Sequence, residues 1–225
     1  MSKTIMDVSR HQGFIDWAKV KASGKIDGVM LRAMGNSAEG KPSAPYTDPQ
    51  FARNYAECKR LGIPCGVYGY FKAANREQSG KELAYFKKLL TGRTFELPVA
   101  VDIEDKAQQA LGKSALTDLV AYILGVVESW GVYAMLYTGL YFGQTFLRMD
   151  GGALSKYDVW LAAYRSTKPS TGWPFGMWQY TSTAHIPGVV DATPGKTTNV
   201  DMSYAYKDYA KIIAKKGLTR LREGK

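Results

Sequence analysis

The most constraining feature of the sequence is the stretch 97–105, in which a run of apolar residues ends in three acidic ones. A strand that is apolar on both faces is typical of a parallel sheet covered by helices. Side chains alternate along a strand, so we expect Asp102 and Glu104 on one face, with their β-carbons about 6.6–7 Å apart. Like charges at the end of a buried strand are costly unless they have a function. For Asp105 the alternative is that it begins a helix, where an acid suits the N-terminal dipole.

Other apolar segments recur along the chain and alternate with helical segments, a pattern that predicts βαβ units and a parallel sheet. The last three predicted strands are separated by little helix, and a closing helix is expected from Tyr204. The pattern favours an α/β fold, a TIM-like (β/α) barrel with an irregular, helix-poor second half. Its eight predicted strands are 5–9, 28–33, 65–71, 98–102, 132–137, 157–162, 176–180 and 198–202.

We expect one catalytic barrel over residues 1–206, with a basic C-terminal helix or tail, 207–225, that is part of this domain or appended to it. The net charge of +10 calls for an acidic partner, such as nucleic acid, an anionic membrane surface or the anionic polymers of a bacterial wall. The alternative for this basic end is a solvated helix face whose apolar side packs on the barrel. The cations of the basic end are Lys207, Lys211, Lys215, Lys216, Arg220, Arg222 and Lys225.

The sequence has no apolar run of the roughly 18–20 residues that cross a bilayer. Its first residues show neither an apolar core nor a cleavage site typical of a signal peptide, so we expect a chain made in the cytosol. Cys58 and Cys65 are then expected to be free thiols.

In a (β/α) barrel the functional residues gather at the carboxyl ends of the strands. Paired carboxylates ringed by aromatic side chains are what glycoside hydrolysis requires, because one acid protonates the leaving oxygen while flat rings stack on sugars. Each aromatic residue alone is more often part of a core, and it is their collection that favours a site. The candidates are the acids Asp7, Asp102, Glu104 and Asp201, with Tyr70, Tyr137, Trp160, Tyr164, Trp178 and Gln179.

The sequence lacks residues that other classes of hydrolase require. His11 and His185 are the only histidines, too few for a zinc amidase, so we expect no metal and no cofactor. The sequence has no G-x-S-x-G motif, and neither cysteine has a neighbouring histidine that suggests a protease dyad. We expect His11 at the rim of the site or in a structural hydrogen bond, and His185 in solvent.

At the level of motifs the sequence resembles family 25 of the glycoside hydrolases, the Chalaropsis-type lysozymes common among bacteriophage endolysins. The resemblance spans about residues 4–206, in order. Its matching segments are 7–13 with 15–17, 28–33, 66–68, 98–104, 137–139, 159–162, 178–182 and 199–202.

The resemblance implies that Glu104 is the general acid and Asp102 its close partner, with Asp7 and Asp201 completing an acidic cleft floor. Asp201 is preferred to Asp191, because Asp201 continues a strand and Asp191 lies among turn formers. Gly69 stands where relatives often carry a bulkier or polar residue, which leaves the width of that subsite open. The resemblance also implies a sugar groove, to which we assign Tyr70, Tyr137, Trp160, Tyr164, Trp178, Gln179 and Arg32.

The function expected is that of an N-acetylmuramidase, which hydrolyses the β-1,4 bond between N-acetylmuramic acid and N-acetylglucosamine in peptidoglycan. We expect a monomeric phage endolysin, held in the host cytoplasm until lysis and then acting on the bacterial wall, with no nucleic-acid partner. Two alternatives stay open. One is a substrate-assisted chitinase or N-acetylglucosaminidase, because Asp102-Ile103-Glu104 also ends such motifs. The other is a sugar-binding barrel without activity.

Overall fold

The computed structural model describes residues 2–189 and 198–222. Asp191, the acid that competes with Asp201 in the sequence, lies outside the described residues. The strands are β1 (Lys3–Val8), β2 (Gly28–Gly35), β3 (Tyr46–Thr47), β4 (Cys65–Phe71), β5 (Val99–Ile103), β6 (Ala134–Gly139), β7 (Asp158–Ala162), β8 (Met177–His185) and β9 (Asn199–Ala205).

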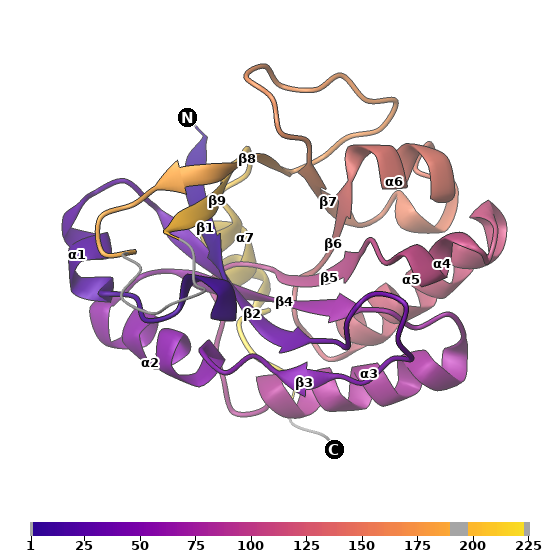
Figure 1. Ribbon diagram of the computed structural model, residues 1–225, viewed down its shortest axis with the longest axis horizontal. Helices are drawn as coiled ribbons and strands as arrows, with labels where there is room; N and C mark the ends of the chain where they lie inside the picture. The colour runs from indigo at the N-terminus through magenta and orange to yellow at the C-terminus, as the bar shows by residue number, and fades with distance from the viewer. Residues whose placement is uncertain (1, 190–197, 223–225) are drawn as a thin grey trace.

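The sheet closes on itself. Its order is β1-β9-β8-β7-β6-β5-β4-β2-β3, and β1 also pairs with β2, so every strand except β3 belongs to a closed barrel of eight (Figure 1). The barrel strands β1, β2 and β4 to β8 run parallel to one another, whereas β9 is antiparallel to both of its neighbours. The predicted α/β barrel is therefore confirmed, with one reversed strand that the sequence pattern did not predict.

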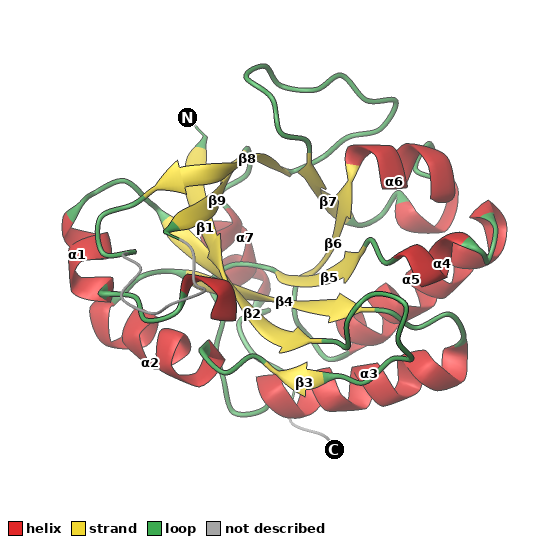
Figure 2. Cartoon of the chain, viewed as in Figure 1, coloured by secondary structure: helices red, strands yellow, loops and turns green. Residues whose placement is uncertain are grey.

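Helices cover the outside of the barrel unevenly (Figure 2). The fully described segment 163–176, between β7 and β8, contains no helix, as expected for the irregular second half. The predicted closing helix is present, but its predicted start at Tyr204 is wrong, because β9 continues to Ala205 and the helix begins at Tyr209 after the cap Asp208. The helices are α1 (Trp17–Ala22), α2 (Phe51–Leu61), α3 (Arg76–Leu90), α4 (Lys106–Gln109), α5 (Lys113–Ser129), α6 (Leu140–Phe146) and α7 (Tyr209–Lys216), with short 3-10 turns at Arg10–Gln12 and Gly152–Leu154.

Strand β5 shows why its apolar sequence needs this fold. All of its residues are buried. Val99, Val101 and Ile103 point outward into the core between sheet and helices, where α5 also contributes its apolar face. Ala100 points into the barrel, and Asp102, two residues further, points the same way. The alternation therefore places the carboxyl group inside the barrel mouth.

An apolar plug fills the opposite end of the barrel. Tyr209 and Ile213 of α7 are buried there, together with interior side chains of the strands. The carboxyl group of Asp158 links the elements at this end. It accepts hydrogen bonds from Tyr133 and Tyr209 and forms an ion pair with Lys207. Within the described residues, α7 thus covers one end of the barrel, and the main cavity opens at the other end, with the acidic side chains.

Both cysteines are free and buried, as expected. Among the described residues, no helix has both the length and the apolar character that crossing a membrane would require.

Candidate active site

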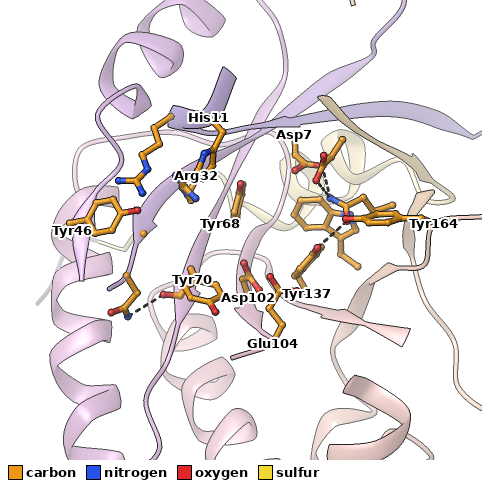
Figure 3. Close-up of a pocket in the computed structure, with 16 residues that line it drawn as sticks. Asp7, His11, Arg32, Tyr46, Tyr68, Tyr70, Asp102, Glu104, Tyr137 and Tyr164 are labelled. Atoms are coloured by element: carbon orange, nitrogen blue, oxygen red, sulfur yellow. Dashed lines mark hydrogen bonds between the residues drawn. The ribbon is translucent and has the colours of Figure 1, made fainter. Parts of the chain in front are cut away.

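A cavity of about 400 Å³ opens at the carboxyl ends of the parallel strands (Figure 3). It contains all four predicted acids. Its walls are formed by Asp7, Arg10, His11, Arg32, Gly35, Asn36, Tyr46, Tyr68, Tyr70, Asp102, Glu104, Tyr137, Trp160, Tyr164, Gln179 and Asp201.

The acids reach the cavity from three strands. Asp7 lies near the end of β1, Asp102 lies in β5, and Glu104 is the first residue after β5. Asp201 is near the start of β9, not at its end as the sequence analysis assumed. It reaches the same place because β9 runs antiparallel, in a register that pairs Asp201 with Asp7. In Figure 3, Asp102 and Glu104 lie next to each other between Tyr70 and Tyr137.

Gln179 of β8 joins two of these acids. Its side-chain amide nitrogen donates hydrogen bonds to Asp7 Oδ2 (3.0 Å) and Asp201 Oδ2 (2.9 Å). Its amide oxygen accepts from the hydroxyl groups of Tyr137 (2.9 Å) and Tyr164 (3.2 Å). One buried amide therefore satisfies four polar groups of the cavity.

Asp7 and Asp102 are both buried, and burial is the main reason why their pKa values lie well above the usual range for aspartate. Repulsion from Asp201 raises the pKa of Asp7 further, although the hydrogen bond from Gln179 opposes this. For Asp102 the neighbouring charge of Glu104 raises the pKa, and the Arg32 guanidinium opposes it. Asp102 Oδ1 is buried and has no hydrogen-bond partner among the described residues.

Glu104 differs from the buried aspartates because its side chain is open to solvent at the cavity mouth. The surrounding walls still displace much of its water, and this desolvation raises its pKa, followed by repulsion from Asp201 and Asp105. Burial raises the pKa of Asp201 to about 6. The site thus combines an accessible carboxyl group, held protonated above its usual range, with carboxyl groups behind it.

Aromatic side chains form the walls beside the acids. The Tyr137 and Tyr68 rings pack edge-to-face on Trp160, with centroids 4.7 and 5.9 Å away, and the Trp160 indole donates to Ser203 Oγ. Tyr70 donates its hydroxyl proton to Asp105 Oδ2 (2.9 Å). Tyr164 is 57% exposed and offers its ring to solvent at the mouth. Trp160 and Tyr137 are buried, whereas the rings of Tyr68, Tyr70 and Tyr164 are at least partly exposed and are flat surfaces on which a sugar ring could pack.

Arg32 lies in the cavity wall as predicted. Its Nε donates to Asp48 Oδ2 (2.7 Å), and Asp48 is itself buried and also accepts from the Arg10 backbone N–H. Arg32 Nη2 is buried without a hydrogen-bond partner among the described residues. The paired guanidinium therefore still has an N–H group to offer.

The prediction that Trp178 lines the groove does not match the structure. Trp178 is absent from the cavity wall, its indole donates to the Ala163 carbonyl (2.8 Å), and its ring packs on Tyr180 and Tyr204. Because Gln179 faces the barrel interior, the adjacent Trp178 must face outward.

Gly69 likewise faces outward. A β-carbon at this position would come 3.0 Å from the Phe86 ring of α3, so Gly69 sets the distance between sheet and helix rather than the width of a subsite. His185 is exposed near the end of β8, outside the cavity wall.

The sequence analysis missed several wall residues. Tyr68 lines the cavity and is two positions before Tyr70, so strand alternation alone could have identified it. Asn36 follows β2 and Tyr46 begins the two-residue strand β3, and no periodic pattern in this part of the sequence gave a signal. Arg10 joins them through its guanidinium, 5.0 Å from the centre of the Tyr46 ring. His11, expected at the rim, does lie in the wall.

Within residues 2–189 and 198–222, no cluster of three histidine, cysteine, aspartate or glutamate residues is arranged to hold a metal ion. The carboxyl groups of the cavity can donate and accept protons, and its partly exposed aromatic rings can pack against a flat ligand.

The family model for glycosyl hydrolases family 25 matches residues 6–189, and the chain belongs to this family. Two curated relatives are the uncharacterized protein YegX of Escherichia coli (strain K12) and Lysozyme M1 of Streptomyces globisporus. YegX is 28% identical over 187 residues, covering 82% of this chain and 65% of YegX. Lysozyme M1 is 28% identical over 196 residues, covering 82% of this chain and 63% of that protein. The chain therefore spans slightly less than two thirds of these relatives.

Solved structures show the same fold. The CTP1L endolysin superimposes with a TM-score of 0.75 at 22% identity, covering 95% of this chain and 70% of that one. The modular autolysin LytC from Streptococcus pneumoniae, solved in complex with a synthetic peptidoglycan ligand, superimposes with a TM-score of 0.73 at 25% identity. That match covers 91% of this chain and 47% of LytC.

Proposed function

We propose that the protein is an N-acetylmuramidase that hydrolyses the β-1,4 bond between N-acetylmuramic acid and N-acetylglucosamine in peptidoglycan. The observation that carries this proposal is the arrangement of Glu104, the one solvent-exposed acid of the four, against the buried carboxyl groups of Asp7 and Asp102. A solvent-reachable carboxyl group with a raised pKa is suited to protonate a leaving oxygen.

In this mechanism Glu104 donates its proton to the glycosidic oxygen as the bond to the anomeric carbon breaks. The developing positive charge lies toward the neighbouring carboxyl groups, which stabilise it. Asp102 presents Oδ1, which has no partner among the described residues, toward the 2-acetamido group of the sugar. Gln179 holds the hydroxyl groups of Tyr137 and Tyr164 in the cavity wall. A water molecule then completes hydrolysis, with Glu104 acting as the base.

Three relatives support peptidoglycan as the substrate. Lysozyme M1 and the CTP1L endolysin bear lytic names, and LytC has been solved with a peptidoglycan ligand. An alternative function on the same site is a substrate-assisted chitinase or N-acetylglucosaminidase, which the adjacency of Asp102 and Glu104 would also serve.

A turbidity assay on purified bacterial cell walls tests hydrolysis directly. We expect the wild type to clear the suspension and Glu104→Gln to lose about 10²–10⁴-fold in rate while remaining folded, because general acid catalysis contributes that much. Glu77→Gln, an exposed glutamate on α3, serves as the matched control and should clear walls normally. Walls that are bound but never cleared would instead indicate a sugar-binding barrel.

The proposed setting is that of a phage endolysin which waits in the host cytoplasm and reaches the wall once the membrane is breached. Expression in the bacterial cytosol should then leave cells intact, and chloroform treatment should cause lysis within minutes. Lysis of untreated cells during expression would contradict this setting.

A further inference from the structure

Lys72 is a buried cation that the proposed reaction does not use directly. It follows β4 and is 3% exposed. A buried ammonium group is costly unless acceptors surround it. Lys72 Nζ donates to the carbonyl oxygens of Ala38 (2.8 Å) and Lys41 (3.0 Å), with both oxygens of Ser37 at 3.3 Å. It also lies 3.6 Å from Asp105 Oδ2. This one ammonium group therefore joins the loop after β2 to the chain after β5.

Asp105 is the next residue after Glu104 and is almost completely buried. Its Oδ1 accepts the backbone N–H of Ala107 (2.8 Å) and so begins α4, as the sequence suggested for this acid. Its Oδ2 accepts the hydroxyl group of Tyr70 and faces Lys72. These contacts of the Asp105 side chain restrict the backbone at Asp105 and therefore at the preceding residue, Glu104.

The loop that Lys72 holds is also a wall of the cavity, because it begins with Asn36. A second buried charge, Glu82 of α3, supports the same loop. Glu82 Oε1 accepts the side-chain amide of Asn36 (2.7 Å) and the backbone N–H of Lys72 (3.1 Å). The buried side chains of Lys72 and Glu82 thus both hold the loop that forms this part of the cavity wall.

We propose that Lys72 is a positioning residue, whose ammonium group fastens Asp105 and the loop 37–41 together and thereby holds Glu104 in the direction required for proton donation. This inference rests on the proposed function for the role of Glu104. The geometric link from Lys72 to Asp105 is independent of it.

Several ionisable groups face Glu104 from the surrounding strands. The acids are Asp7 on β1, Asp102 on β5, Asp105 after it and Asp201 on β9. The phenols are those of Tyr70 on β4, Tyr137 on β6 and Tyr164 after β7. Removal of Lys72 leaves the negative charge of Asp105 uncompensated beside Glu104.

The experiment compares Lys72→Met, Asp105→Asn and the double variant, with Lys59→Met as the control. Lys59 also forms an ion pair, with Glu96, but it lies outside the cavity wall. Two quantities are measured: kcat on soluble peptidoglycan fragments, and the pKa of Glu104 by carboxyl ¹³C NMR, assigned through Glu104→Gln. Because the titration needs no turnover, an inactive wild type would overturn the proposed function while the link from Lys72 to Glu104 is still measured.

We expect Lys72→Met to raise the pKa of Glu104 and to lower kcat about tenfold, since small displacements of a catalytic group have effects of this order or larger. Asp105→Asn should lower the pKa of Glu104, and adding it to Lys72→Met should restore part of the lost kcat. The result that overturns the proposal is Lys72→Met behaving like Lys59→Met in both quantities. If Lys72→Met does not fold, an unchanged Glu104 pKa in Asp105→Asn overturns it instead.

Discussion

The position of Asp102 suits the proposed reaction but lowers the folding stability of the protein. Its carboxyl group is buried, repelled by Glu104, and has one oxygen without a partner among the described residues. Such a group is retained at the expense of folding stability, because ionising it inside the protein is unfavourable.

Replacing Asp102 with asparagine should therefore stabilise the protein. The folded-state pKa of Asp102 is raised, so the folded state binds a proton more tightly than the unfolded state. Stability from this group is complete below the ordinary aspartate pKa of about 3.9 and is lost as the pH rises toward the raised value. We expect Asp102→Asn to increase the free energy of unfolding by about 1–2 kcal/mol at pH 7, and by less at pH 4.

Urea denaturation at the two pH values measures this difference. Asp118→Asn, at an exposed position on α5, is the control and should change stability little at either pH. An Asp102→Asn variant that is no more stable than wild type at pH 7 would contradict the account of this carboxyl group.

The stereochemistry of hydrolysis also follows from Asp102. Both sugars of the proposed substrate carry a 2-acetamido group whose oxygen can attack the anomeric carbon from within, and Asp102 can orient that group. Direct attack by a carboxylate would retain the configuration as well. We predict retention, so ¹H NMR of fresh digestion products should show the β-anomer first. Early α-anomer would mean inversion and different roles for the acids.

At the scale of elements, β8 and β9 assemble the site by joining acids that are far apart in sequence. Gln179 on β8 contacts Asp7 on β1, Asp201 on β9 and Tyr137 on β6. Four strands therefore meet at one amide group. Without this amide the buried side chains of Asp7 and Tyr137 would each lose a hydrogen bond, at a cost of about 1–3 kcal/mol for each group left unsatisfied.

Gln179→Leu should accordingly destabilise the protein by about 2–4 kcal/mol in urea denaturation at pH 7. Gln144→Leu, on the exposed face of α6, is the control and should change the free energy of unfolding by no more than about 0.5 kcal/mol. Equal stability of the two variants would show that Gln179 does not hold the strands together.

The strands could be predicted because their apolar runs are distinct, and the four acids because they end or begin such runs. The direction of β9 could not be predicted, since a period of two residues is the same in both directions. Trp178 and Gln179 are adjacent in one strand and cannot both face the barrel interior, so strict alternation would have removed Trp178. Lys72 gave no signal, because a single lysine after a strand is usually solvated.

At the scale of the whole molecule, the barrel has an open acidic end and an opposite end closed by α7. The buried side of α7 contributes Tyr209 and Ile213 to the core, which is the packing expected of a structural helix. Its other side presents Lys211, Lys215 and Lys216 to solvent. The basic end can thus both close the barrel and offer positive charge to an anionic wall.

If that charge binds the wall, lysis should decrease as salt shortens the Debye length from about 10 Å at 0.1 M. Changing Lys215, Lys216, Arg220 and Arg222 to glutamine should weaken this salt dependence. A control with the same loss of charge replaces four exposed lysines outside the basic end, Lys25, Lys81, Lys87 and Lys88. The same salt profile in both variants would identify the basic end as a solvated helix face.

The most direct measurement of the central claim identifies the new reducing ends released from purified peptidoglycan, after borohydride reduction, by mass spectrometry. Cleavage by a muramidase produces reduced N-acetylmuramic acid, and we expect this product from the wild type, at a rate about 10²–10⁴-fold higher than from Glu104→Gln. Reduced N-acetylglucosamine at the new ends would identify a glucosaminidase instead, and the absence of new ends would contradict hydrolysis by this site.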